Sequence, residues 1–149
     1  AGDSARGGPF RCPVRTAAEQ WRVGEAVMAF QQIGEQFCQH YYQTFDSNRA
    51  GLHPLYSQQS MLTFEGDQFQ GADAIVQKIM SLPFTKVQHQ IVKCDCQPSV
   101  NDGIVIFITG NLLVDDNANP LKFAQVFQLL KGPTGNYYCH NDMFRLNIG

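Results

Sequence analysis

The sequence lacks any apolar run long enough to cross a membrane as a helix. Its longest candidate, Ile104 to Ile108, ends at Thr109 and Gly110, far short of the ~18–20 residues that a bilayer requires. We therefore expect no membrane partner. Hydrophobic residues make up 44% of the 149 positions and charged residues 16%, a composition that indicates one domain with one packed core.

The sequence also lacks an extracellular signature. Its five cysteines follow no disulfide-framework spacing and no Asn-x-Ser/Thr acceptor is present, which favours a reducing compartment. Cys94 and Cys96 lie in an alternating segment typical of a strand, where positions i and i+2 are ~6.6 Å apart on one face. That spacing suits neither a disulfide nor an isolated zinc site. We interpret both as half-buried thiols.

Signals for cofactors, metals and nucleic acid are absent as well. There is no glycine-rich phosphate loop and no G-x-S-x-G elbow, and His40, His53, His89 and His140 are not spaced as metal ligands, so we expect no cofactor. Residues 28–149 carry seven basic and ten acidic residues and no Lys/Arg cluster. This balance argues against a nucleic acid partner and is compatible with a basic protein surface.

Residues 1–27 differ in composition from the rest of the chain. They are rich in Gly, Ala and Arg and lack the apolar stretch of a secretory signal. We expect a leader or appended extension before a domain that spans residues 28–149. A transit peptide is one alternative, and an extension of the first helix over residues 17–27 is another.

From Phe30 onward the pattern predicts alternating helices and strands. Apolar residues recur every three or four positions as far as Phe45, which predicts an amphipathic helix that ends at residues 46–48. The elements expected after it are a short helix (49–55), two short strands (61–65 and 68–70), a helix (72–81) and four long strands (86–98, 103–114, 121–131 and 137–148).

Both faces of the expected strand at residues 121–131 carry apolar side chains, so the sheet needs cover on each side. Helices can cover one face and a second subunit the other. The element order therefore predicts an α+β fold: a cone-shaped, curved antiparallel β-sheet wrapped around a long N-terminal helix, with dimer formation.

Four segments carry a resemblance to a known family: FQQIGEQFCQHYYQTFD (Phe30 to Asp46), LTFEGDQFQG (Leu62 to Gly71), SLPFTKVQHQI (Ser81 to Ile91) and NDMFRLN (Asn141 to Asn147). In this order they resemble the nuclear transport factor 2 family, across essentially all of residues 28–149. The resemblance implies a homodimer that carries the GDP form of the small GTPase Ran into the nucleus and binds FxFG repeats of nucleoporins. It also implies residence in the cytoplasm, the nucleus and the nuclear pore complex.

The resemblance also implies site residues. The acidic rim of a Ran-binding cavity maps to Glu65 and Asp115, with Asp116 left open because the 115–120 loop is longer than in some members. The cavity wall maps to Phe64, Leu82 and Phe144, with Phe64 where many members have Trp. A nucleoporin patch maps to Phe30 and Val87, and the dimer face includes Met143.

Two alternatives stay open at this point. The same cone fold houses dehydratases and ketosteroid isomerases, for which Asp142 with His89, Tyr56 or His140 would supply the acid, base and hydroxyl groups. A heterodimerising subunit of an RNA-export factor is the other. The ordered resemblance favours the carrier over an enzyme.

Overall fold

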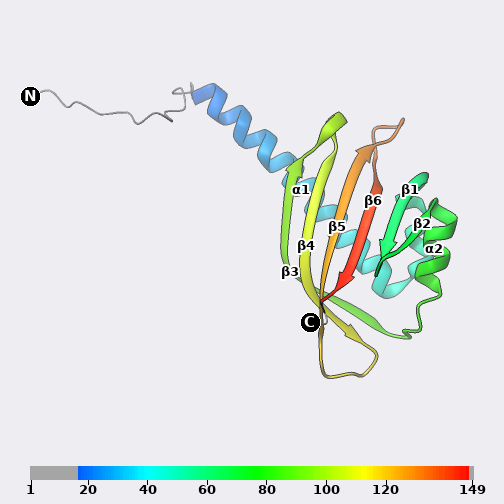
Figure 1. Ribbon diagram of the computed structural model, residues 1–149. Helices are drawn as coiled ribbons and strands as arrows, with labels where there is room; N and C mark the ends of the chain where they lie inside the picture. The colour runs from blue at the N-terminus through cyan, green and yellow to red at the C-terminus, as the bar shows by residue number, and fades with distance from the viewer. Residues whose placement is uncertain (1–16, 148–149) are drawn as a thin grey trace, which may run out of the picture.

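The long first helix, α1 (Ala17–Ser47), runs along the concave side of a curved sheet (Figure 1). The computed structural model describes residues 17–147, with side chains from residue 29 onward. Phe37, Tyr41 and Phe45 recur every four residues and are buried against the sheet, as the periodicity of an amphipathic helix predicts. The helix ends where Asn48 takes an extended backbone conformation.

Nine further elements follow α1 within the described residues. They are a 3-10 helix η1 (Arg49–Leu55), β1 (Tyr56–Phe64), β2 (Asp67–Gln70), α2 (Ala72–Met80), β3 (Val87–Pro98), a 3-10 turn η2 (Val100–Asp102), β4 (Ile104–Val114), β5 (Leu121–Lys131) and β6 (Tyr137–Leu146). The predicted order of elements is confirmed. The main difference in bounds is β1, which begins at Tyr56 rather than at residue 61.

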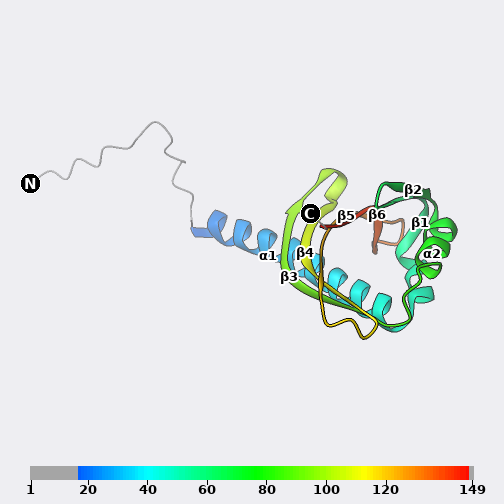
Figure 2. The same cartoon turned by 60° about the horizontal axis from the view of Figure 1, so that its bottom comes forward.

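The six strands form one sheet in the order β2-β1-β6-β5-β4-β3. The sheet curves around α1, while α2 lies beside β1 and β2 (Figure 2). Our expectation of an antiparallel sheet was wrong at one seam, because β1 and β6 run parallel and place Phe64 opposite Phe144. The two strands are far apart in the sequence and no hairpin turn links them, so local sequence does not determine their relative direction.

A bulge in β6 changes which side chains point inward. Gln128 pairs with Asn141 and Leu129 with Cys139, which leaves His140 without a partner residue on β5. The extra residue shifts the alternation, so that Cys139 and Asp142 are both buried on the α1 side. No helix within residues 17–147 is long and apolar enough to cross a membrane.

The predicted boundary between residues 27 and 28 falls within α1, which begins at Ala17. The helix therefore continues through it, as in the alternative that extends the first helix. Residues 1–16 of the expected leader lie outside the described residues. The division into a leader and a domain stays a prediction.

Candidate functional site

A largely apolar pocket opens at the end of the sheet where β1, β4 and β6 finish. Its walls come from α1, α2, the inner face of the sheet and the segment between α2 and β3. The lining residues are Tyr41, Phe45, Leu62, Phe64, Ile79, Leu82, Phe84, Val87, His89, Leu112, Gln125 and Phe144. The cavity within it measures about 20 Å³, room for about one water molecule. A larger group can enter only if the walls move.

Two stacked rings, Phe64 and Phe144, form one wall of the pocket, and Phe144 also stacks on Phe123 outside the lining. The Phe64 and Phe144 rings are 4.8 Å apart and nearly parallel, and Phe144 continues onto Phe123 at 5.6 Å. The parallel pairing of β1 with β6 creates this contact, because it sets Phe64 directly opposite Phe144. The ammonium group of Lys78 lies 5.7 Å from the centre of the Phe64 ring.

Glu65 follows this wall directly, in the turn between β1 and β2. Its backbone has φ 50, a left-handed conformation that costs energy for a residue with a side chain. Two contacts with β6 compensate: the Glu65 amide donates to the Phe144 carbonyl at 3.1 Å, and the Glu65 carboxylate accepts from the Leu146 amide. The half-buried carboxylate is thus held beside the aromatic wall.

Asp115 lies at the same end of the sheet, beyond β4. Its Oδ1 accepts from the amides of Thr85 and Lys86, each at 3.0 Å, and its own amide donates to the Lys86 carbonyl at 2.7 Å. These bonds tie the β4–β5 loop to the start of β3. Asp115 and Asp116 are both exposed and line a shallow groove next to the pocket.

The structure therefore brings the predicted acids and the predicted wall to one end of the sheet. Glu65 follows β1 and Asp115 follows β4, with β6 and β5 between these strands, so the two acids are on the order of 14 Å apart across the sheet. Leu82 lines the pocket between them from the loop after α2. The arrangement is an apolar pocket flanked by carboxylates.

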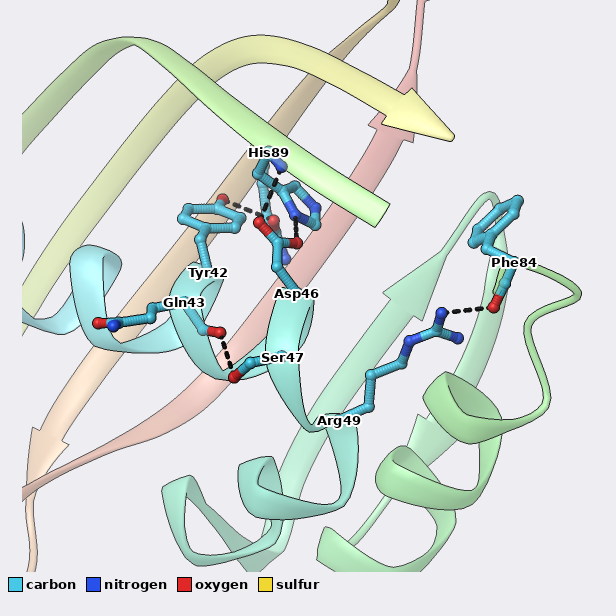
Figure 3. Close-up of polar contacts among 8 residues, drawn as sticks. Tyr42, Gln43, Asp46, Ser47, Arg49, Phe84 and His89 are labelled. Atoms are coloured by element: carbon cyan, nitrogen blue, oxygen red, sulfur yellow. Dashed lines mark hydrogen bonds and ion pairs between the residues drawn. The ribbon is translucent and has the colours of Figure 1, made fainter. Parts of the chain in front are cut away.

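The loop that carries Leu82 and Phe84 is secured by Arg49, a residue that the sequence analysis missed. The Arg49 guanidinium donates to the Phe84 carbonyl at 2.6 Å (Figure 3). It donates to the Leu82 carbonyl as well, at 3.5 Å. It also lies 5.6 Å from the centre of the Phe45 ring. An isolated Arg in a turn carries no sequence signal for such a role, because the acceptors are backbone carbonyls 33 and 35 residues away.

His89 and Asp46 join α1 to β3 at the pocket. His89 Nδ1 lies 2.6 Å from Asp46 Oδ1, and the His89 amide donates to Asp46 Oδ2 at 2.9 Å (Figure 3). The rings of Tyr42, Phe45 and Phe123 surround the imidazole, with centroids 4.7 to 5.3 Å away. Asp46, which the sequence analysis used only to mark a helix end, is thus a structural partner of a pocket residue.

Asp142 is buried behind the pocket within a polar network. Its Oδ2 accepts from Tyr56 at 2.7 Å and from Tyr41 at 3.4 Å, and its Oδ1 accepts from Gln125 at 2.7 Å. Tyr42 in turn donates to Gln125. Burial raises the pKa of Asp142 to about 6, although the hydrogen bonds from Gln125, Tyr56 and Tyr41 each lower it.

Phe30 and Val87 do not form one patch within the chain. Val87 is 7% exposed and lines the pocket beside the C-terminal end of α1. Phe30 is half-buried on α1, sixteen residues before Asp46, which corresponds to ~24 Å along a helix. Within one chain Val87 therefore adds no exposed surface to Phe30, and the assignment of both to a nucleoporin patch stays a prediction. The neighbours of Val87, Lys86 and Gln88, are exposed. The side chain of Val87 points inward because its face of β3 packs against α1.

Met143 lies on the convex face of the sheet and is 50% exposed. In the register of the sheet it is opposite Val126, which is opposite Phe107 on β4. Phe107 is 47% exposed. A contiguous apolar row thus crosses the middle of this face.

Within the part of the chain that the structure describes, the thiols and histidines are not arranged as a metal site. Across residues 29–147 no group of three His, Cys, Asp or Glu side chains has an arrangement that could hold a metal ion. Cys94 is half-buried, as expected, whereas Cys96 is buried.

Comparisons with known proteins agree with this architecture. Residues 33–146 match the model of the nuclear transport factor 2 (NTF2) domain. The chain is 53% identical to nuclear transport factor 2 of Emericella nidulans over 118 residues (78% of this chain, 94% of that protein) and 52% identical to that of Candida glabrata over 122 residues (80% and 96%).

A solved structure gives the same result in three dimensions. The structure of nuclear transport factor 2 from Cryptosporidium parvum superposes with a TM-score of 0.76 at 54% identity, and the match covers 79% of this chain and 94% of that one. The domain match and these levels of identity, over most of both chains, show that the chain belongs to the nuclear transport factor 2 family.

Proposed function

We propose that this chain is a nuclear import carrier that works as a homodimer, binds the GDP form of Ran at the pocket end of the sheet and binds FxFG nucleoporin repeats elsewhere. The observation that carries the proposal is the aromatic pocket flanked by Glu65 and Asp115, in a chain about half identical to named transport factors. Such a carrier moves between the cytoplasm and the nucleus through the nuclear pore complex.

The pocket supports an aromatic anchor from the partner. The parallel rings of Phe64 and Phe144 offer a flat apolar wall, and buried aromatic side chains contribute much of the binding energy at protein interfaces. Because the cavity has room for about one water molecule, an incoming ring must displace part of the wall. Leu82 and Phe84 are the candidates to move, since they lie between α2 and β3 and belong to no helix or strand. Arg49 would limit this movement through its bonds to the two carbonyls.

The flanking acids support a basic partner surface. Glu65 is held in place by β6, and Asp115 and Asp116 are exposed across the pocket. Fixed charges of this kind raise the rate of association and orient the partner. Asp115 also holds Thr85 and Lys86 through its carboxylate, so its effect on binding combines charge with loop structure.

The test is retention of purified Ran loaded with GDP or GTP on the immobilised chain. We expect retention of the GDP form only, and expect Glu65→Lys to abolish it. Glu65→Gln keeps an acceptor for the Leu146 amide but removes the charge, so it should weaken binding about tenfold and reduce the salt dependence. Asp102→Asn, an equal charge change at the opposite end of the sheet, is the control. Wild-type retention by Glu65→Lys at low and physiological salt would remove Glu65 from the site.

Within this proposal the nucleoporin contact rests on Phe30 alone. Phe30 is a half-buried aromatic on α1, far from the pocket, and a partly exposed ring can accept Phe side chains of a repeat. Phe30→Ala should weaken FxFG binding and leave retention of GDP-bound Ran unchanged. Loss of both activities would indicate a folding defect.

The homodimer rests on the row of Phe107, Val126 and Met143. A contiguous apolar row on a sheet face indicates an interface, and a second copy of the chain offers a matching row. The rival reading, a heterodimer with a different cone-fold subunit, predicts that the purified chain sediments as a monomer.

The geometry favours the carrier over the enzyme. The carboxylate of Asp142 accepts from three donors and is 1% exposed, and it does not line the pocket. His89 lines the pocket, and its Nδ1 is paired with Asp46 on α1 and not with Asp142. A base that serves a substrate must lie within reach of the reacting atom. Asp142, Tyr56 and His140 do not line the pocket, so no nominated pair meets there.

A further inference from the structure

Three thiols from two elements meet where α1 packs against β3. Cys38 lies on α1, and Cys94 and Cys96 lie on β3. The Sγ atom of Cys94 is 4.0 Å from that of Cys38 and 3.9 Å from that of Cys96. Cys38 and Cys96 are buried, whereas Cys94 is half-buried. Cys94 is therefore the central thiol of the three and the one that solvent reaches most easily.

The packing around the cluster holds these thiols close together. A Cβ atom at Gly34 would lie only 2.4 Å from Cys96 Sγ, so the glycine allows the helix to approach the strand. One turn earlier, Gln31 donates through Nε2 to the Cys94 carbonyl at 3.4 Å. Both contacts precede Cys38 on α1 and hold the helix against β3 next to the sulfur atoms.

The neighbours of Cys94 divide the cluster into two kinds of thiol. The pKa of Cys94 is lowered to about 7, chiefly by the hydrogen bond with Cys38 and also by the one with Cys96, while burial, Glu35 and Asp95 oppose the shift. The pKa of Cys38 is raised well above its usual value by the same hydrogen bond and by burial. Near neutral pH a large fraction of Cys94 is thiolate, which is the nucleophilic form.

We propose that Cys94 is a modification site that reacts with small-molecule disulfides and then closes a reversible disulfide with Cys38. In the first step the Cys94 thiolate attacks one sulfur of the small disulfide, forms a mixed disulfide and releases one small thiolate. In the second step Cys38 loses its proton to the departing thiolate and attacks Cys94 Sγ. The second small molecule leaves as a thiol, so two protein thiols are oxidised and the small disulfide is reduced to two thiols.

Geometry selects Cys38 over Cys96 as the second thiol. Cys94 and Cys96 are positions i and i+2 of one strand, with Cα atoms ~6.6 Å apart and side chains directed the same way, which is unfavourable for a disulfide. Cys38 approaches from the facing helix. The inference concerns the α1–β3 junction and is independent of the proposed Ran site.

The experiment uses the full chain with Cys12→Ser, because Cys12 lies outside the described residues. The chain is incubated with glutathione disulfide at pH 7, free thiols are blocked, and the products are mapped by mass spectrometry without reduction. We expect a link between Cys38 and Cys94 that reducing agent reverses. The proposal would be overturned if glutathione disulfide reacted first with Cys96 or Cys139, or with no cysteine at all.

Two variants test the order of steps. Cys38→Ala should stop at a glutathione mixed disulfide on Cys94, whereas Cys96→Ala should still close the link to Cys38. The rate of alkylation of Cys94 by iodoacetamide should have a midpoint near pH 7 in the parent chain. In Cys38→Ala the midpoint of this pH dependence should move toward ~8.5, so the rate of alkylation at pH 7 should fall about tenfold. An unchanged midpoint in folded Cys38→Ala, checked by circular dichroism, would contradict the assigned role of Cys38.

Discussion

The two faces of the sheet are made by the same strands but differ in what they bury. On the concave face, Phe127 and Asp142 are at most 1% exposed, and the carboxylate of Asp142 is fully engaged by tyrosine and glutamine. On the convex face, Phe107 and Met143 are about half exposed. Within one chain α1 covers the concave side of the sheet, whereas the convex side leaves an apolar row that a second copy would cover. Mutations on the two faces should therefore act on different properties: fold stability on one and association on the other.

The largest effect is expected from Phe127→Ala on the concave face. The Phe127 ring is in contact with Phe37 and Tyr41 at centroid distances of 5.3 and 4.8 Å, so its removal leaves a cavity and should cost about 3–5 kcal/mol of the free energy of unfolding. Phe107→Ala removes the same ring from the convex face and should cost about 1 kcal/mol. Urea denaturation measures both, and equal losses would contradict the division between the faces.

The next effect concerns the pH dependence of stability through Asp142. Burial raises the pKa of this carboxyl from 3.8 to about 6, so between these pH values the folded chain binds a proton that the unfolded chain has released. Stability from this group is therefore full below about pH 4 and is lost as the pH rises through about 6, a total of roughly 3 kcal/mol.

Asp142→Asn removes this titration. The difference in unfolding free energy between the parent chain and Asp142→Asn should fall by about 3 kcal/mol from pH 4 to pH 7. Urea denaturation at a series of pH values measures it. A difference that stays constant over this range would show that Asp142 does not titrate between the folded and unfolded states.

A smaller effect is expected from Met143→Glu on the convex face. A carboxylate in the proposed subunit interface would be buried without a partner, and we expect association to weaken about 100-fold, close to 2.8 kcal/mol. Met80→Glu, which changes a similarly exposed methionine on α2, is the control. In sedimentation, Met143→Glu should be monomeric and Met80→Glu dimeric. A dimeric Met143→Glu would place the interface elsewhere.

The smallest effect is expected from Arg49, which holds a surface loop and neither face of the sheet. Arg49→Met removes the bonds to the carbonyls of Leu82 and Phe84 and should cost about 1 kcal/mol of global stability. Faster amide hydrogen exchange is expected at residues 82–86, and Arg49→Lys should restore part of the protection. Unchanged exchange in Arg49→Met would mean that the loop is held by its apolar contacts.

Local patterns in the sequence were sufficient for the elements and for part of the site. The four-residue spacing of Phe37, Tyr41 and Phe45 predicts the stripe of α1 that packs on the sheet, because a helix places such residues on one face. The resemblance predicted the positions of Glu65, Phe64, Phe144 and Asp115 at the pocket end. These residues follow or lie within strands whose order along the chain was already visible.

Contacts between segments far apart in the sequence could not be predicted from such local patterns. The parallel pairing of β1 and β6, the bulge at His140 and the burial of Val87 each depend on contacts between residues far apart in the sequence. Cys38 and Cys94 are 56 residues apart, and neither position marks the other. Their proximity follows only from the packing of α1 on β3.

By itself the sequence determined the element order, the amphipathic first helix and membership of a family, because these depend on residue type and spacing along the chain. The tertiary structure alone decided which face of each strand is inside. It also decided that Arg49 secures the pocket loop and that three cysteines meet at one junction. The physical reason is that inward and outward directions, and backbone acceptors for a distant side chain, exist only after the sheet has curved around the helix.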